Sequence, residues 1–255
     1  MRRLITFPCE GDTLVGTVDE AAGETGLLIV SGGNEVRVGA HRGMATLAAA
    51  LAEKGVPVLR FDRRGIGDSG GENRGWSDSA DDIAAAAAVF RTEAPGVRRV
   101  VGFGNCDAAA ALALFGRPAG MDAIVLANPW TGDDERDDLP PAAAIRARYA
   151  DRLRSGAQWR RLLTGGVAFG TLWRGLRKAV RSGPRPLADR IARSDPAAII
   201  LAERDATAQA FLAAVAKRAR ELPIVKVPTA SHSFTRPDAA AALEAAVLAV
   251  VRATR

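Results

Sequence analysis

The stretch Gly102-Phe103-Gly104-Asn105-Cys106-Asp107-Ala108 decides the fold that the sequence predicts. It follows an apolar run that has the composition of a buried strand, and it opens an Ala-rich segment that has the composition of a helix. A sharp strand-to-helix turn needs small residues two positions before and two positions after its apex, because larger side chains would collide there. Gly104 and Ala108 meet this requirement around Cys106. The pattern therefore predicts an elbow that presents the Cys106 thiol as a candidate nucleophile.

Apolar strands and amphipathic helices alternate on both sides of this turn, with short loops between them. Such alternation is typical of a mostly parallel sheet with helices on both faces. The first two strands are expected to form an antiparallel edge of that sheet. The expected strands are 4–7, 13–18, 27–30, 56–61, 99–103, 123–127, 198–202 and 224–227, and the expected helices are 41–54, 79–93, 107–115, 206–219 and 236–251.

The alternation stops between residues 131 and 187, where no strand pattern is found. We expect residues 1–130 and 188–255 to form the α/β core and residues 131–187 to form a helical cap over the carboxyl ends of the strands, where open α/β sheets bind ligands. An amphipathic cap with its charges in water accounts for this composition; a substrate pocket beside an anion-binding surface does so as well. The aromatic and aliphatic candidates for the pocket are Trp159, Phe169, Trp173 and Leu176, and the arginines are Arg146, Arg148, Arg152, Arg154, Arg160 and Arg161.

Two histidines are available as a general base. His232 follows the last expected strand and precedes the last helix, which is where this architecture places its base. The alternative for His232 is a loop residue that packs against or caps that helix. His41 lies at the start of an early helix and is expected to have a structural or pocket-lining role.

The acid that orients the base is expected after the next-to-last strand. Asp205 lies there, 27 residues before His232, and its carboxylate would hold the imidazole tautomer and stabilise the imidazolium. Glu203 competes for the same role. A helix N-cap is the alternative for either carboxylate, since a helix is expected to begin at Ala206.

The loop after the third strand, Ser31-Gly32-Gly33-Asn34, is the expected second half of an oxyanion hole. We expect the backbone N–H of Gly33, or alternatively of Asn34, to act together with the N–H of Asp107. The alternative is a tight turn that simply needs glycine. The Asp107 carboxylate works against a thiolate beside it, so the thiol is expected to need a histidine partner.

A second segment matches a nucleophile motif, but its context does not support a nucleophile. Gly67-Asp68-Ser69-Gly70-Gly71 has the form G-x-S-x-G, and it is also similar to the serine motif of chymotrypsin-like proteases. No helix directly follows Ser69, and those proteases are all-β whereas this chain alternates. We therefore expect Ser69 to belong to a structural loop.

The chain order of nucleophile, acid and base, Cys106, Asp205 and His232, is that of the α/β-hydrolase fold. Several motifs in order also resemble the exosortase A system-associated hydrolases, type one. A cysteine at the elbow is similar to dienelactone hydrolases too, although those share little else with this chain. The motifs are Ser31-Gly32-Gly33-Asn34, Arg37-Val38-Gly39, His41-Arg42, Arg60-Phe61-Asp62, Gly65-Ile66-Gly67-Asp68-Ser69, Gly104-Asn105-Cys106-Asp107-Ala108-Ala109 and Asn128-Pro129-Trp130.

The resemblance implies an α/β-hydrolase with a hydrolytic or acyl-transfer role near bacterial exopolysaccharide synthesis or protein sorting, and it supplies no substrate. The residues themselves predict cleavage of an ester or thioester, small or carrier-bound, through an acyl-enzyme on Cys106. The alternatives are acyl transfer to a sugar or lipid acceptor, and a non-catalytic accessory protein that keeps the fold.

Composition narrows the remaining classes. The chain has 255 residues, 48% of them hydrophobic, so intrinsic disorder is excluded, and with only two cysteines a disulfide scaffold is excluded as well. No apolar run approaches the ~18 residues that span a bilayer. No cofactor, metal or nucleic-acid motif is found, and we expect a cytoplasmic protein. The formal charge of +6 leaves association with a membrane surface or an anionic substrate open.

Overall fold

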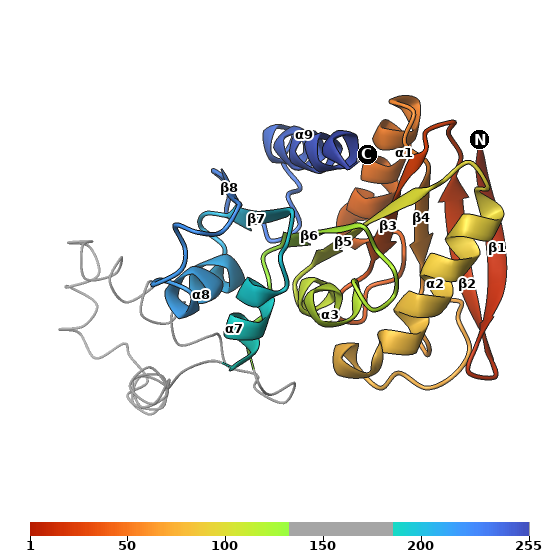
Figure 1. Cartoon of the computed structure of the whole chain (residues 1–255), viewed down its shortest axis with the longest axis horizontal. Helices are drawn as coiled ribbons and strands as arrows, with labels where there is room; N and C mark the ends of the chain where they lie inside the picture. Colours follow the sequence, from red (N-terminus) through yellow and green to blue (C-terminus); the bar gives the residue numbers. More distant parts are fainter. Residues whose placement is uncertain (133–185, 255) are drawn as a thin grey trace, which may run out of the picture.

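The computed structural model describes residues 1–132 and 186–254. These residues form eight strands and six α-helices, together with short 3-10 turns at Ala40–Arg42 and Trp76–Asp78 (Figure 1). The strands are β1 (Arg2–Cys9), β2 (Asp12–Asp19), β3 (Thr25–Val30), β4 (Val58–Phe61), β5 (Arg99–Asn105), β6 (Ala123–Ala127), β7 (Ala198–Ala202) and β8 (Ile224–Val227). The helices are α1 (Gly43–Glu53), α2 (Ala80–Glu93), α3 (Asp107–Phe115), α7 (Pro186–Arg193), α8 (Ala206–Ala214) and α9 (Pro237–Ala253).

The strands form one sheet with the order β1-β2-β4-β3-β5-β6-β7-β8. β1 pairs antiparallel with β2, and β2 pairs antiparallel with β4, while every pair from β4 to β8 is parallel. The predicted parallel sheet with an antiparallel edge is confirmed. Because parallel strands all end at the same edge, the loops after β3, β4, β5, β6, β7 and β8 lie at one rim.

Alternate side chains of the central strands serve two separate cores, as the period of two in a strand requires. Leu28 packs with α2, α3, α7 and α8 on one face, whereas Leu27 and Ile29 pack with α1 and α9 on the other. Figure 1 shows these two helical layers on opposite faces of the twisted sheet. With both faces covered, the strand interiors are nearly continuous apolar runs.

Three helices show the largest differences from the sequence prediction. α1 begins at Gly43 and not at residue 41, because His41 and Arg42 have the positive φ values of 52° and 62° that an α-helix cannot hold. α8 ends at Ala214 and not at residue 219, since Val215 leaves the helical region. The sequence did not predict α7, which packs its apolar side chains into the core.

Two further predictions meet the limits of the described chain. The predicted cap, residues 131–187, falls outside the described residues except at its two ends. None of the helices in residues 1–132 and 186–254 is long and apolar enough to cross a membrane.

Candidate active site

Cys106 lies at the apex of a sharp turn between β5 and α3. Its backbone has φ 62° and ψ −124°, a region that a non-glycine residue adopts only when its surroundings enforce it. The enforcing contacts are hydrogen bonds from the Cys106 N–H to the Ala127 carbonyl (3.0 Å) and from the Trp130 N–H to the Cys106 carbonyl (3.0 Å). A Cβ at Gly104 would lie 2.7 Å from the backbone carbon of Ala108. The small residues predicted at these positions are therefore required by packing.

The thiol faces a cavity of about 580 Å³. Cys106 is half-buried, and Asp107, Trp76 and Trp130 line the same cavity together with the loop after β3. The cavity opens at the carboxyl rim of the sheet, where ligands bind to parallel α/β sheets.

His232 lies in the loop between β8 and α9, within interaction range of both Cys106 and Asp205. Its Nδ1 is 3.1 Å from Asp205 Oδ1. Burial alone lowers the pKa of His232, but the hydrogen bonds to Asp205 and Cys106 outweigh burial and raise that pKa to about 10. The structure therefore favours the protonated form of the His232 imidazole.

Asp205 combines the two roles that the sequence left open. It is the N-cap of α8, where its Oδ2 accepts hydrogen bonds from the N–H groups of Thr207 (2.9 Å) and Ala208 (3.0 Å). Its Oδ1 is left for His232. Burial raises the pKa of Asp205, and the hydrogen bond to His232 and the helix N–H groups more than offset this and lower it. Glu203 is exposed, and within the described residues its carboxylate makes no contact with His232.

Two asparagines donate hydrogen bonds to the backbone carbonyl of His232, and the sequence analysis did not assign them this role. Asn128 is fully buried after β6 and donates from Nδ2 to the carbonyl of His232 (3.0 Å) and to Asn105 Oδ1 (3.1 Å). Asn105, next to the thiol, also donates to the His232 carbonyl (3.2 Å). Asn128 Oδ1 accepts from the N–H of Ala202 at the end of β7 (2.8 Å). The sequence shows an asparagine at the end of each of the two apolar strands β5 and β6. It does not show that both bind a residue more than 100 positions away.

The loop after β3 differs from the oxyanion hole that the sequence predicts. The N–H of Gly33, the first choice for an oxyanion donor, donates to Asp107 Oδ1 at 2.6 Å. It can meet an oxyanion only when that carboxylate releases it. The N–H groups of Asn34 and Asp107 have no hydrogen-bond acceptor among the described residues. On its other side, the Gly33 carbonyl accepts a hydrogen bond from Arg63 Nη2 (2.5 Å).

Comparison with known proteins agrees with this architecture. Residues 27–246 match the model of the Alpha/beta hydrolase family. The chain belongs to this family. The match confirms the predicted fold class and the expectation of an enzyme of the hydrolase class. No curated protein matches the sequence of the hydrolase.

Solved structures share the fold at low identity. XC6422 from Xanthomonas campestris, described as an a/b serine hydrolase without lid, is 17% identical with a TM-score of 0.61, over 98% of this chain and 94% of that one. The esterase Pf2001 from Pyrococcus furiosus is 14% identical with a TM-score of 0.63, over 98% and 92% of the two chains. GrgF, an alpha/beta hydrolase from Penicillium sp. sh18, is 19% identical with a TM-score of 0.62, over 100% and 99%. At these identities the likeness extends to the fold alone.

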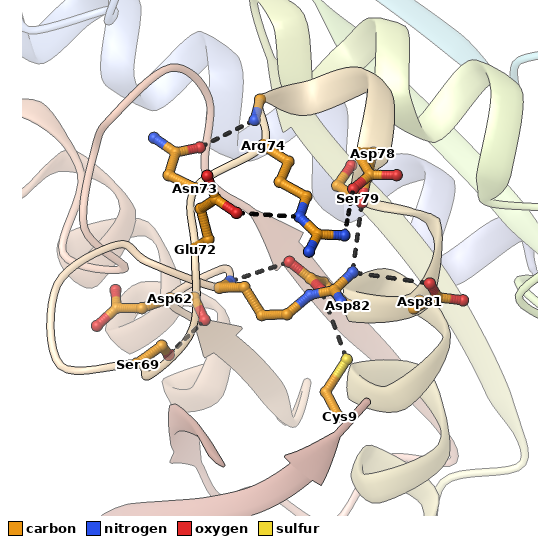
Figure 2. Close-up of polar contacts among 12 residues, drawn as sticks. Cys9, Asp62, Ser69, Glu72, Asn73, Arg74, Asp78, Ser79, Asp81 and Asp82 are labelled. Atoms are coloured by element: carbon orange, nitrogen blue, oxygen red, sulfur yellow. Dashed lines mark hydrogen bonds and ion pairs between the residues drawn. The ribbon is translucent and has the colours of Figure 1, made fainter. Parts of the chain in front are cut away.

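Other residues that the sequence singled out lie away from the thiol of the hydrolase. Ser69 Oγ donates to the Asp62 carbonyl (2.7 Å), as Figure 2 shows. It also accepts from the N–H of Val15 (2.9 Å), so it ties the loop after β4 to β2. Cys9 is buried against Asp82 in the same region (Figure 2). His41 lines a separate cavity of about 160 Å³. The pocket candidates Trp159, Phe169 and Trp173, Leu176 and the six arginines of the predicted cap lie outside the described residues.

Proposed function

We propose that the hydrolase cleaves an ester or thioester through an acyl-enzyme on Cys106, with His232 as the proton carrier and Asp205 as the carboxylate that orients it. The observation that carries the proposal is the place of His232 between Cys106 and Asp205, with its Nδ1 3.1 Å from Asp205 Oδ1, beside a cavity that Cys106 lines. A nucleophile, a base and an orienting acid in this relation are the common arrangement of covalent acyl transfer.

In the first half-reaction the sulfur of Cys106 attacks the substrate carbonyl carbon. A C–S bond forms, and the carbonyl electron pair moves onto oxygen. The Asp107 N–H and the Asn34 N–H are the donors that stabilise this oxyanion, and the Gly33 N–H joins them when the Asp107 carboxylate releases it. The imidazolium of His232 then gives its proton to the leaving oxygen or sulfur as that bond breaks.

In the second half-reaction water attacks the thioester carbon, and His232 takes the proton of that water. The C–S bond breaks, the carboxylic acid leaves, and the pair of Cys106 and His232 is restored. The charge of Asp205 stabilises the imidazolium in both halves, which agrees with the raised pKa of His232. The place of this activity beside exopolysaccharide synthesis, implied by the resemblance to exosortase-associated hydrolases, is part of the same proposal.

The test is intact-mass detection of an acyl adduct after the protein is mixed with a panel of short-chain thioesters and p-nitrophenyl esters. We expect one acyl group on Cys106, turnover with at least one class, and loss of both in Cys106→Ala. His232→Ala should leave the fold intact but slow acylation by about 10²-fold or more. Ser69→Ala is the control and should still be acylated. Acylation of Ser69, or no adduct with any member of the panel, would refute the proposal.

A further inference from the structure

A buried arginine beside the nucleophile lacks a counterion. Arg63 is 5% exposed and lies in the loop that follows β4. Within residues 1–132 and 186–254, no carboxylate comes within 4 Å of its guanidinium, and its side chain makes a single hydrogen bond, to the carbonyl of Gly33. A buried cation is normally paired, because removing a charge from water is costly unless another charge compensates it.

The neighbouring arginines show the contrast. Arg60, equally buried, has Asp19 at 3.1 Å. Arg64 is paired with Asp82. Arg74 is 61% exposed and lies near Glu72 and Asp78, as Figure 2 shows. Arg63 is therefore the exception in a segment in which the other arginines have carboxylate partners.

The guanidinium of Arg63 has donors without a protein partner among the described residues, and Arg63 lines the cavity that holds the thiol. Arg63 and Cys106 line the same cavity, and the only hydrogen-bonded neighbour of the Arg63 side chain is the loop that faces Cys106. The other guanidinium nitrogens have no protein partner among the described residues, yet they are not among the fully enclosed unsatisfied atoms. They therefore retain some contact with open space. Arg63 lines the cavity that holds Cys106 and also a smaller neighbouring cavity beside Glu72 and Asp78, and in the first of these a ligand oxygen can meet the guanidinium.

Other polar groups of the lining suit the same ligand. Asn34 uses its side-chain oxygen to accept from Asn73 Nδ2 (2.8 Å), which leaves its own amide N–H₂ without a partner among the described residues. Arg74 also lines the cavity, although its charge is partly compensated by Glu72 and Asp78. Among the described residues of the lining the single carboxylate is that of Asp107, and it is engaged by the Gly33 N–H.

We propose that Arg63 is an anion-binding residue of the substrate site, and that the hydrolase prefers an ester or thioester carrying a carboxylate or phosphate group. The planar guanidinium can bind either anion through two parallel N–H···O bonds. The inference rests on the proposed function for the identity of the reacting bond, while the anion preference rests on Arg63 alone. Arg63 also holds the Gly33 carbonyl, so its substitution affects both the loop and the ligand, and the test has to separate these effects.

The test compares isosteric pairs of substrates with the same reacting bond. The acyl arm uses succinyl against 4-methylpentanoyl thioesters of one thiol, which differ in a carboxylate against an isopropyl group. The leaving-group arm uses acetyl-4′-phosphopantetheine against acetyl-pantetheine, which differ in a phosphate. The readout is the ratio of kcat/KM within each pair, because a displaced Gly33 loop slows both members equally.

We expect wild-type protein to favour the anionic member of one arm by about tenfold to a hundredfold, the range for a hydrogen bond to a charged group. The arm that shows the preference tells whether the anion lies on the acyl or the leaving group. Arg63→Gln should bring that ratio close to one, and Arg63→Lys should keep part of it because the charge remains. A wild-type ratio near one in both arms, or a ratio that Arg63→Gln leaves unchanged, would overturn the proposal.

A binding measurement separates the proposed anion site from the proposed acyl-enzyme reaction. Calorimetric titration of the same four ligands into Cys106→Ala reports the anion preference without any turnover. A preference there that depends on Arg63, with no acylation in the intact protein, would refute the proposed function and leave the anion site standing. Equal binding of the paired ligands would refute the anion site, whatever the kinetics.

Discussion

Asn128 offers the sharpest test of how the base is held. In Asn128→Asp the side chain keeps its shape, its acceptor for the Ala202 N–H and its tolerance of the positive φ of 39° at this position. What changes is the donor. In wild type the Nδ2 of Asn128 donates to the His232 carbonyl and to Asn105 Oδ1. The substitution places a carboxyl oxygen at about the same position, facing both acceptors.

The expected loss of stability follows from how many of the two acceptors of Asn128 Nδ2 are left without a donor. The His232 carbonyl keeps its bond from Asn105 Nδ2, so Asn105 Oδ1 is the acceptor left without a donor. A buried acceptor left unsatisfied costs about 1–3 kcal/mol, and keeping the new buried carboxyl neutral adds to that cost, so the free energy of unfolding should fall by at least that amount. The loop carrying His232 also loses one of its two anchors. A displacement of ~1 Å at a reacting group can cost about 10²-fold, so we expect the reactivity of Cys106 to fall at least tenfold.

The assay needs no knowledge of the substrate. The second-order rate constant for alkylation of Cys106 by iodoacetamide at neutral pH reports the state of the pair of Cys106 and His232, and urea unfolding reports stability. Ile124→Val is the matched control: it is fully buried in β6, should lose about 0.5–1.5 kcal/mol, and has no contact with the base. If Asn128→Asp alkylates as fast as Ile124→Val, the asparagine does not position His232.

Three further outcomes follow from the structure. Gly104→Ala places a Cβ 2.7 Å from the backbone of α3, and its free energy of unfolding in urea should fall by about 1–3 kcal/mol. In the control Gly96→Ala the Cβ meets nothing within 4 Å, and the free energy of unfolding should stay within about 0.5 kcal/mol of wild type. Equal unfolding midpoints of the two variants would contradict the packing of the elbow. Iodoacetamide at pH ~8 should modify one thiol of the folded protein by intact mass, because burial raises the pKa of Cys9 to about 12 while Cys106 faces the cavity; a second adduct would contradict this. The raised pKa of His232 contributes stability that is complete below pH ~6.5 and is lost as the pH rises through about 10, so Tm should fall more steeply between pH ~8.5 and ~10.5 in wild type than in His232→Gln, and parallel curves would refute the shift.

Local composition was enough to predict the parts of the fold that local rules control. The bounds of β6, β7, β8 and α3 agree with the expectation to the residue, because each is an apolar run or an Ala-rich helix with clear breakers at its ends. The elbow was predictable because its small residues, Gly104 among them, are a steric requirement of the turn itself. The short helix α7 was missed, since eight residues carry too little periodicity to stand out from the segment before it.

The contacts that arrange the site were not predictable in the same way. The bond between Gly33 and Asp107 joins residues 74 apart, and that between Asn128 and His232 joins residues 104 apart. No local pattern encodes which of several polar groups at a shared rim will pair, because the choice depends on where the finished sheet places each loop. The sequence therefore predicted the positions from which the candidate residues extend, but not the carbonyls and amides that hold them.

Those contacts connect five loops through backbone atoms. Asp107 holds the N–H of Gly33, and Arg63 holds its carbonyl, so the loop after β3 is fixed from the loops after β5 and β4. The carbonyl of His232 is fixed in turn from the loops after β5 and β6. Because the nucleophile turn takes part in both sets, a shift of Cys106 is transmitted to the base loop and to the loop that faces the oxyanion together. Asp107 adds a condition to this arrangement, because its carboxylate must release the Gly33 N–H before that N–H can bind a substrate oxygen. An incoming anion that engages Arg63 therefore acts on the carbonyl side of the same residue that Asp107 restrains at its N–H.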